Sequence, residues 1–441
     1  MTQDDYTSHP RAWHQSPFTW FILLILVAII AFVVWLMQPV PPSSVQLVTQ
    51  AEELLKQGEV KQAEELLQPL VTKTPPDHNA VVVCSRALFQ QGRTADCVEL
   101  LNKLPARDAA SSLVSLARAS LESPPKLSQS EFLFRAALEA NPDDIDAHRE
   151  LARILGLSAR RYEAIPHILF LIRAGKETDL IVLLAHEQSM FGDRSTLEAA
   201  QAAAPDDPLP LIGLAGIELA EGHRERSIEL LREAIKLNPN LSAPWGRLGS
   251  YLVQAEDWDA LAIWANDLPK VAFESPETWQ ALGDIARHGD DTAGAIRCYG
   301  EALLKNPESY AMTTHMAELL AQHGEQQLAD KLSERAGQIG RFEQLVIQTN
   351  SMNQQPSPEQ MINLINAYVA TGRYWEATAF VTMAANAEVN PNRLTRIIEV
   401  LRPEVPNLPL QLTAPKHNPL AGFDLSPFPV PGAPSPDDRG Q

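Results

Sequence analysis

The sequence predicts an all-α protein: a right-handed α-solenoid of about ten helical hairpins, preceded by one apolar helix. Two observations support this prediction. Aromatic, apolar and small residues recur with a period of 34 residues, and residues 18–37 form an unbroken apolar stretch. A period of this length is typical of stacked helical hairpins, each of which buries its apolar face only against its neighbours.

The clearest hairpin begins at Trp279. Trp279, Leu282 and Ala286 are spaced at i, i+3 and i+7, so they share one face of a helix. Gly283 stands inside that helix, where a glycine costs about 1 kcal/mol relative to alanine. A second helix that approaches closely at this point explains such a glycine, and the approaching residue would be the equally small Ala295.

The spacing of these residues resembles that of the tetratricopeptide repeat. The same frame recurs at multiples of 34 residues, and weaker matches extend over most of the chain. The resemblance implies that the signature positions pack helix against helix. These positions are Trp245, Gly249, Trp279, Leu282, Gly283, Ala295, Tyr299, Ala302 and Pro307.

We expect five segments along the chain. In order they are an N-terminal flank (1–17), a transmembrane helix (18–37), a linker of prolines and serines (38–44), the solenoid (45–402) and a proline-rich disordered tail (403–441). The tail holds ten prolines in 39 residues, a composition that favours polyproline II over a packed core. The alternative is a recognition arm, in which Phe423 and Phe428 anchor the tail to a partner or to the protein's own groove.

The apolar segment 18–37 is predicted to cross a lipid bilayer. It carries no charge, and a helix of its length spans about 30 Å, the thickness of the hydrocarbon core. Trp20 and Trp35 lie near its ends, where aromatic rings favour the interface. A cleaved signal peptide is the alternative, but the prolines that follow make a poor cleavage site. Arg11 precedes the segment and no Lys or Arg follows it until Lys56, so we expect the repeats outside the cytoplasm.

The charge of the chain argues against two classes of partner. The formal net charge is −19, of which −16 falls on the repeats between the apolar segment and the tail. Nucleic acid and anionic lipid headgroups repel such a body, so we expect other proteins or peptides as partners and no nucleic acid. The bilayer itself is expected to be contacted only through residues 18–37.

The three cysteines show no metal-binding spacing. Cys84 and Cys97 occupy two positions that pack together in the repeat frame, so they form either a disulfide or two buried thiols that act as small apolar residues. The chain also lacks phosphate-binding and nucleophile-elbow motifs, and a zincin-like His186-Glu187 pair fails because Met190 replaces the second histidine. We therefore expect no cofactor, no metal and no enzymatic activity.

In tetratricopeptide proteins the first helix of each hairpin lines the peptide-binding groove, which implies a set of candidates here. Arg149 and Arg153 lie one turn apart and suit an acidic peptide or a terminal carboxylate. Ile212 lies in an apolar stretch, and the other candidates offer mixed charges and amides. The full set is Arg149, Arg153, Ile212, Asp284, Arg287, His288, Asn363 and Asn366.

The function that follows is a single-pass membrane-anchored scaffold for protein–protein interactions. The chain resembles bacterial inner-membrane proteins in which one N-terminal anchor carries tetratricopeptide repeats, which implies a role in envelope assembly or secretion. One alternative is a structural protein that self-assembles at the membrane. Another is a non-catalytic partner of a glycosyltransferase or of a cytochrome maturation system.

Overall fold

The structure is a computed structural model that describes residues 20–21, 24–30, 42–122, 125–176, 184, 193–350, 356–387 and 389–430. Within these ranges the chain is helical and contains no strand. The chain divides into two compact units, 1–91 and 92–441. The observed fold is therefore the all-α arrangement that the sequence predicts.

The predicted transmembrane helix falls largely outside the described residues. Of the segment 18–37, only 20–21 and 24–30 are described, and these are helical. No helix in the described part of the chain combines the length and the apolar character needed to cross a bilayer.

The first unit consists of three consecutive helices: α2 (Ser44–Lys56), α3 (Val60–Val71) and α4 (His78–Gln90). The first of them begins with a reciprocal cap, in which Ser43 accepts a hydrogen bond from the Gln46 amide and Gln46 accepts one from the Ser43 amide. Ala63 and Leu67 of α3 are fully buried. Each helix packs against the next one along the chain.

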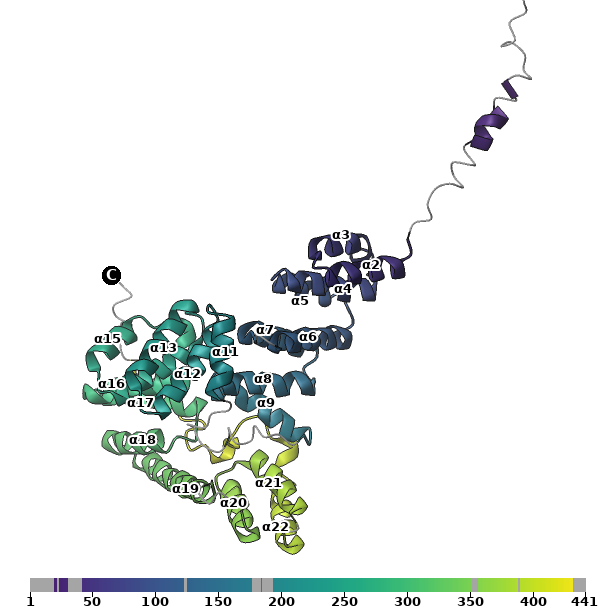
Figure 1. Ribbon diagram of the computed structural model, residues 1–441. Helices are drawn as coiled ribbons and strands as arrows, with labels where there is room; N and C mark the ends of the chain where they lie inside the picture. The colour runs from purple at the N-terminus through teal and green to yellow at the C-terminus, as the bar shows by residue number, and fades with distance from the viewer. Residues whose placement is uncertain are drawn as a thin grey trace, which may run out of the picture. The chain divides into compact units, whose positions relative to one another are not determined.

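The second unit continues the pattern of helical hairpins, as Figure 1 shows. Its α-helices are α5 (Thr94–Leu101), α6 (Ala106–Leu121), α7 (Leu127–Ala140), α8 (Ile145–Leu157), α9 (Arg161–Arg173), α11 (Arg194–Ala203), α12 (Pro208–Ala220), α13 (Arg224–Leu237), α14 (Ser242–Gln254), α15 (Trp258–Asn266), α16 (Pro276–His288), α17 (Thr292–Lys305), α18 (Tyr310–His323), α19 (Gln326–Asn350), α20 (Pro358–Ala370), α21 (Tyr374–Asn386) and α22 (Pro391–Leu401). The most extensive helix pairs are neighbours in sequence, such as α6 with α7 and α16 with α17.

Glycine allows the two helices of a hairpin to approach closely. A Cβ atom added to Gly283 of α16 would lie 2.8 Å from the ring of Tyr299 on α17. In the preceding hairpin, a Cβ added to Gly249 would lie 2.4 Å from the Trp264 ring. Both distances are shorter than a van der Waals contact, so the rings occupy the space that any larger residue would need.

The signature tryptophans fix the turn that precedes each first helix. The indole N–H of Trp245 donates to the Pro239 carbonyl at 3.0 Å, and that of Trp279 donates to the Phe273 carbonyl at 2.9 Å. In both cases the acceptor lies six residues earlier, so the same bond recurs in two repeats. The remaining signature positions on α17, Ala295, Tyr299 and Ala302, are fully buried.

Four buried charges join the α18–α19 hairpin to the α20–α21 hairpin in the second unit. Glu308, in the turn before α18, pairs with Arg335 of α19 at 3.0 Å and with Arg373 at 3.7 Å. Arg373 also pairs with Glu376 of α21 at 2.7 Å. All four side chains are at most 4% exposed, and their charges cancel. Such a cluster is stable only when each charge keeps its partner, so it fixes the relative positions of these elements.

The first part of the tail, residues 403–430, differs from the disorder expected for it. After α22 the segment contains two short 3-10 turns and packs back on α21. The Trp375 indole donates to the Pro409 carbonyl at 3.0 Å, and the Ala414 amide donates to the Gly372 carbonyl at 2.9 Å.

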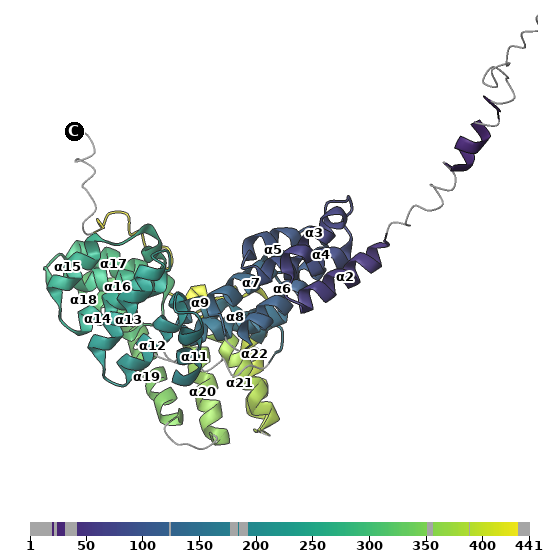
Figure 2. The same cartoon turned by 45° about the horizontal axis from the view of Figure 1, so that its top comes forward.

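The tail then reaches α17, beside which Figures 1 and 2 both show the yellow segment. Leu420, Leu425 and Phe428 join the apolar cluster formed by α16 to α19. Burying each of these side chains contributes roughly 1.5–3 kcal/mol, which explains why a proline-rich segment is held in place. Residues 431–441 of the predicted tail lie outside the described residues.

Cys84 and Cys97 are both buried thiols in the structure.

The Gly283–Tyr299 contact predicts opposite effects for two glycine substitutions. Gly283→Ala should lower the free energy of unfolding by about 1–3 kcal/mol, because the added methyl group overlaps the Tyr299 ring. The matched control is Gly337→Ala in α19, where the nearest atom to an added Cβ is the flexible tip of Arg341 at 3.4 Å. That change should be neutral or stabilise by up to about 1 kcal/mol through helix propensity. Urea denaturation followed by circular dichroism measures both, and equal effects would contradict the account.

Candidate functional site

An open pocket lies between the first helices of two successive hairpins in the second unit. Figure 1 shows the α6–α7 and α8–α9 pairs stacked next to each other. The pocket has a volume of ≈ 880 Å³. The residues that line it come from α6, from the turn before α8, from the start of α8 and from the segment just after α9. They include Arg107, Ser111, Ser115, Arg118, Glu122, Asp143, Asp144, Asp146, Arg149 and Lys176. We call it the α6–α8 pocket.

Two arginines on different helices hold one carboxylate inside this pocket. Arg149 of α8 pairs with Asp146 at 2.7 Å, and Arg118 of α6 pairs with the other oxygen of Asp146 at 3.3 Å. The Arg118 and Asp146 side chains are 45% and 48% exposed, so water screens these ion pairs. Exposed pairs of this kind contribute little to stability, and a carboxylate from another molecule can therefore replace Asp146 at low cost.

Two further cations lie at the rim of the pocket. Arg107 and Lys176 are exposed, and neither makes an ion pair with any residue that the structure describes. The lining thus holds four cations and four carboxylates, whereas the repeats as a whole carry a charge of −16. One of the carboxylates, Asp144, is already engaged as the N-cap of α8, where it accepts from the Ala147 amide at 2.9 Å.

One face of α6 supplies polar groups at helical spacing. Arg107, Ser111, Ser115 and Arg118 follow one another at four, four and three residues, and all four are exposed. Hydroxyl groups can both donate and accept hydrogen bonds, so Ser111 and Ser115 suit the backbone of an extended peptide. The sequence contains this stripe, but exposed polar stripes occur on most surface helices and do not by themselves indicate a site.

Of the residues predicted for the groove, Arg149 alone lines this pocket. Arg153, one turn further along α8, is half-buried and does not line it. Ile212 is fully buried in α12, so it belongs to the core. Asn363 and Asn366 are exposed on α20. The structure therefore does not gather the predicted set into one site.

Three of the predicted residues make contacts within the repeats. Asp284 is buried and accepts a hydrogen bond from the Tyr299 hydroxyl at 2.6 Å, and burial raises the pKa of its carboxyl group. Arg287 donates to the same hydroxyl at 3.3 Å. The His288 ring stacks on Trp258 with 3.7 Å between the ring centres. The first two contacts join the two helices of one hairpin, α16 and α17, and the third joins α16 to α15 of the preceding hairpin.

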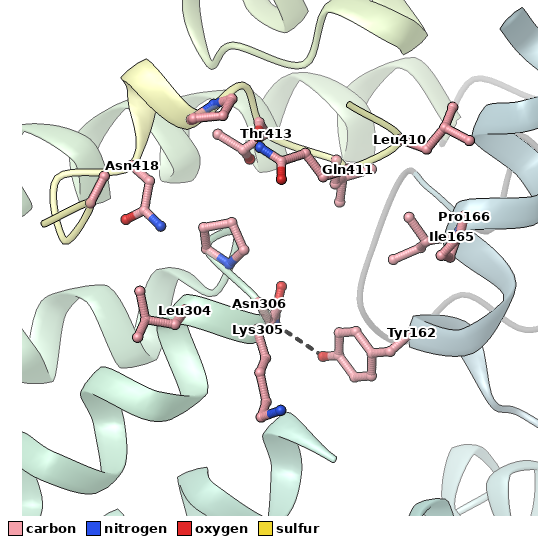
Figure 3. Close-up of a pocket in the computed structure, with 14 residues that line it drawn as sticks. Tyr162, Ile165, Pro166, Leu304, Lys305, Asn306, Leu410, Gln411, Thr413 and Asn418 are labelled. Carbon is pink, nitrogen blue, oxygen red and sulfur yellow. Dashed lines mark hydrogen bonds between the residues drawn. The ribbon is translucent and has the colours of Figure 1, made fainter. Parts of the chain in front are cut away.

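A second, smaller cavity of ≈ 330 Å³ lies where the tail crosses α9 and the turn after α17. Figure 3 shows the Tyr162 hydroxyl at its edge, where it accepts a hydrogen bond from the Asn306 amide at 3.0 Å. Gln411 and Thr413 of the tail form the opposite side. The tail therefore forms one wall of this cavity.

One cluster in the described part of the chain has the geometry of a metal site. The ligand atoms of Glu218, Glu221 and His223 lie within 4.8 Å of one another. Arg194 already supplies a positive charge there, at 2.7 Å from both glutamates. The cluster is thus an exposed ion-pair network of ordinary composition, and it gives no independent indication of a metal.

Comparison with known proteins identifies the repeat. Residues 54–121, from the end of α2 to the end of α6, match the family described as "Tetratricopeptide repeat". This part of the chain carries tetratricopeptide repeats. No curated protein sequence matches the chain.

Two solved structures are similar to this chain. The crystal structure of the APC/C hetero-tetramer Cut9-Hcn1 aligns over 85% of this chain and 72% of its own, with 13% identity and a TM-score of 0.30. The Pseudomonas aeruginosa pilF structure aligns over 67% of this chain and 99% of its own, with 11% identity and a TM-score of 0.24. The repeat assignment depends on the family match and on the hairpin geometry, since TM-scores of this size do not establish a common arrangement.

A pair of histidines holds α8, which carries Arg149, against α9. The Nδ1 atoms of His148 and His167 lie 2.8 Å apart, and His148 Nε2 lies 2.9 Å from the Pro142 carbonyl. Because a carbonyl only accepts, His148 carries its proton on Nε2 and receives a hydrogen bond from His167 Nδ1. Burial disfavours the charged form of both rings. Burial lowers the pKa of each, to about 3 for His167.

The histidine pair predicts that acid destabilises the protein. The pKa of His167 is lower in the folded than in the unfolded chain, so between pH 6.5 and about pH 3 the unfolded chain binds more protons. The contribution of His167 to the free energy of unfolding is therefore fully present above pH 6.5, and it is lost as the pH falls towards 3. His167→Gln keeps a donor for His148 and should flatten this dependence between pH 7 and pH 5 by up to about 1 kcal/mol per pH unit. Urea denaturation at several pH values measures the slope.

The control for this measurement is His78→Gln, which replaces an exposed histidine at the start of α4. If both substitutions alter the slope equally, the buried pair is not its source.

Proposed function

We propose that this protein is a single-pass membrane-anchored scaffold whose tetratricopeptide repeats bind an acidic segment of a partner protein in the α6–α8 pocket. The observation that carries the proposal is the pair Arg118 and Arg149, which come from successive first helices and converge on one carboxylate, Asp146. A partner carboxylate placed there would meet the same two guanidinium groups. Arg107 and Lys176, which make no ion pair among the described residues, would extend this recognition to a second acidic residue.

The pocket suits a peptide more than a small molecule. It is open and ≈ 880 Å³ in volume, and its polar groups follow one face of α6 over three turns. Such a stripe matches an extended chain with several contact points, whereas drug-sized ligands bind in enclosed and largely apolar pockets. The acidic character of the remaining repeats would keep acidic partners from binding elsewhere.

The membrane anchor and the cellular role are part of the proposal. The uncharged segment 18–37 supports an anchor, and Arg11 on its N-terminal side supports repeats that face away from the cytoplasm. A scaffold in that position suits envelope assembly or secretion, and we infer no catalytic activity for it.

Charge reversal in the pocket should abolish binding of acidic peptides. The probe is a set of fluorescent decapeptides with two or three Asp or Glu residues, each beside a matched peptide with Asn or Gln. In the purified full chain, Arg118→Glu combined with Arg149→Glu should lower the affinity for the tightest-binding acidic peptide by about tenfold to a hundredfold, because two charge-assisted contacts become repulsive. Fluorescence anisotropy measures the dissociation constants.

The matched control reverses two exposed arginines on α13, Arg226 and Arg232, and so changes the net charge by the same amount. It should leave binding within about twofold. Equal losses in both variants would show that only net charge matters and would refute the pocket. Equal binding of acidic and amide peptides to the unmodified chain would refute recognition of carboxylates.

A further inference from the structure

We propose a second peptide-binding site on α17 and α18, which the protein's own tail occupies. We define this tail site by Arg297, Gly300 and His323. Its ligand is a peptide whose leucine and phenylalanine, three residues apart, are brought together by a turn, which in the tail is closed by the hydrogen bond from the Phe428 amide to the Leu425 carbonyl at 3.1 Å. The bound example is Leu425-Ser426-Pro427-Phe428 of the tail itself.

A glycine in α17 creates the seat for the leucine. A Cβ atom added to Gly300 would lie 2.4 Å from a methyl group of Leu425, so the leucine side chain lies directly on the helix backbone. Gly300 is buried within α17, where a glycine without such a contact would only weaken the helix. The seat therefore selects a branched aliphatic side chain of limited size.

The phenylalanine makes the second anchoring contact. Phe428 is 7% exposed, and its ring lies 5.2 Å from that of His323 at the end of α18. The ring of Phe423, earlier in the tail, lies 6.0 Å from the ring of Phe428. The residues between the anchors, Ser426 and Pro427, are exposed, so they need not be matched in a ligand.

An arginine binds the peptide backbone through carbonyl groups, which every residue type carries. Arg297 donates to the Leu425 carbonyl at 3.1 Å and to the Phe428 carbonyl at 3.5 Å. Glu301, at 2.9 Å, fixes the guanidinium in this position. A site that reads only carbonyl groups tolerates proline, because proline lacks an N–H but keeps its carbonyl.

Two features make the tail a replaceable occupant. Between Leu420 and Val430 the only buried side chains are those of Leu420, Leu425 and Phe428, so the segment can open without disturbing the helices. In addition, the Nε atom of Arg297 is buried and has no acceptor among the described residues. An external peptide that offers one more acceptor would therefore satisfy the site better than the tail does.

Binding in trans tests the proposal. The probe is a fluorescent peptide of residues 419–430, and the protein is the full chain in detergent. The tail acts as a competitor at an effective concentration of about 1 mM, so the unmodified chain should bind the peptide weakly. Leu425→Ser combined with Phe428→Ser loosens the tail but leaves the site intact, and it should tighten binding by about tenfold or more.

The substitution Gly300→Leu, added to the loosened chain, should remove this gain because its side chain fills the leucine seat. The matched control is Gly337→Leu, in α19, where space is available. The proposal is overturned if the loosened chain binds no better than the unmodified one, or if Gly300→Leu and Gly337→Leu have the same effect.

A second measurement uses the unmodified chain and so does not depend on the folding of any variant. Hydrogen–deuterium exchange of residues 419–430 is followed with and without an excess of a synthetic peptide that contains Leu-Ser-Pro-Phe. Displacement of the tail should speed its exchange at millimolar peptide, while the same peptide with serine in place of phenylalanine should have no effect. Unchanged exchange with both peptides would show a permanent strap and overturn the proposal.

Discussion

The close approach of the two helices in each hairpin is the constraint on which the rest of the structure depends. The ring of Tyr299 lies against Gly283 and that of Trp264 against Gly249, so the helices of these two hairpins are in close contact. Polar residues remain accessible on the first helices α6 and α8, although residues 208–216 of α12 are all buried. The stripe on α6 and the arginine of α8 are such residues, and the stacking of two hairpins brings them to one pocket.

Contacts between distant repeats add a second level of order. The neutral cluster of Glu308, Arg335, Arg373 and Glu376 joins the turn before α18 to α19 and α21. The helices α9 and α21, separated by some 200 residues of sequence, also pack together. Buried charges of this kind stabilise less than apolar packing would, but they allow only one arrangement of the helices that carry them. The tail packs on the same part of the chain, where it covers the apolar cluster formed by α16 to α19.

The sequence predicts the repeat well because the period and the small residues at helix crossings are local properties of the chain. It predicts the binding site poorly. Arg149 was identified, but Arg118 was not, because a carboxylate held between two helices depends on how successive hairpins stack. Ile212 was assigned to the groove on its helical position, yet it is buried: α11 packs on α12, and Gly213 lies against Leu197. The many prolines of the tail favour disorder, whereas the alternative in which Phe423 and Phe428 anchor the tail to the protein itself agrees with the apolar side chains that decide where it lies.

The measurement that tests the central claim most directly is a double-mutant cycle between Arg149 and a glutamate of a bound acidic peptide. Arg149→Ala in the protein is combined with glutamine for glutamate in the peptide, and the four dissociation constants give the coupling free energy. Direct contact in the α6–α8 pocket predicts a coupling of about 1 kcal/mol or more that weakens as salt is added. A coupling near zero for every acidic position of the peptide would contradict a carboxylate-binding scaffold.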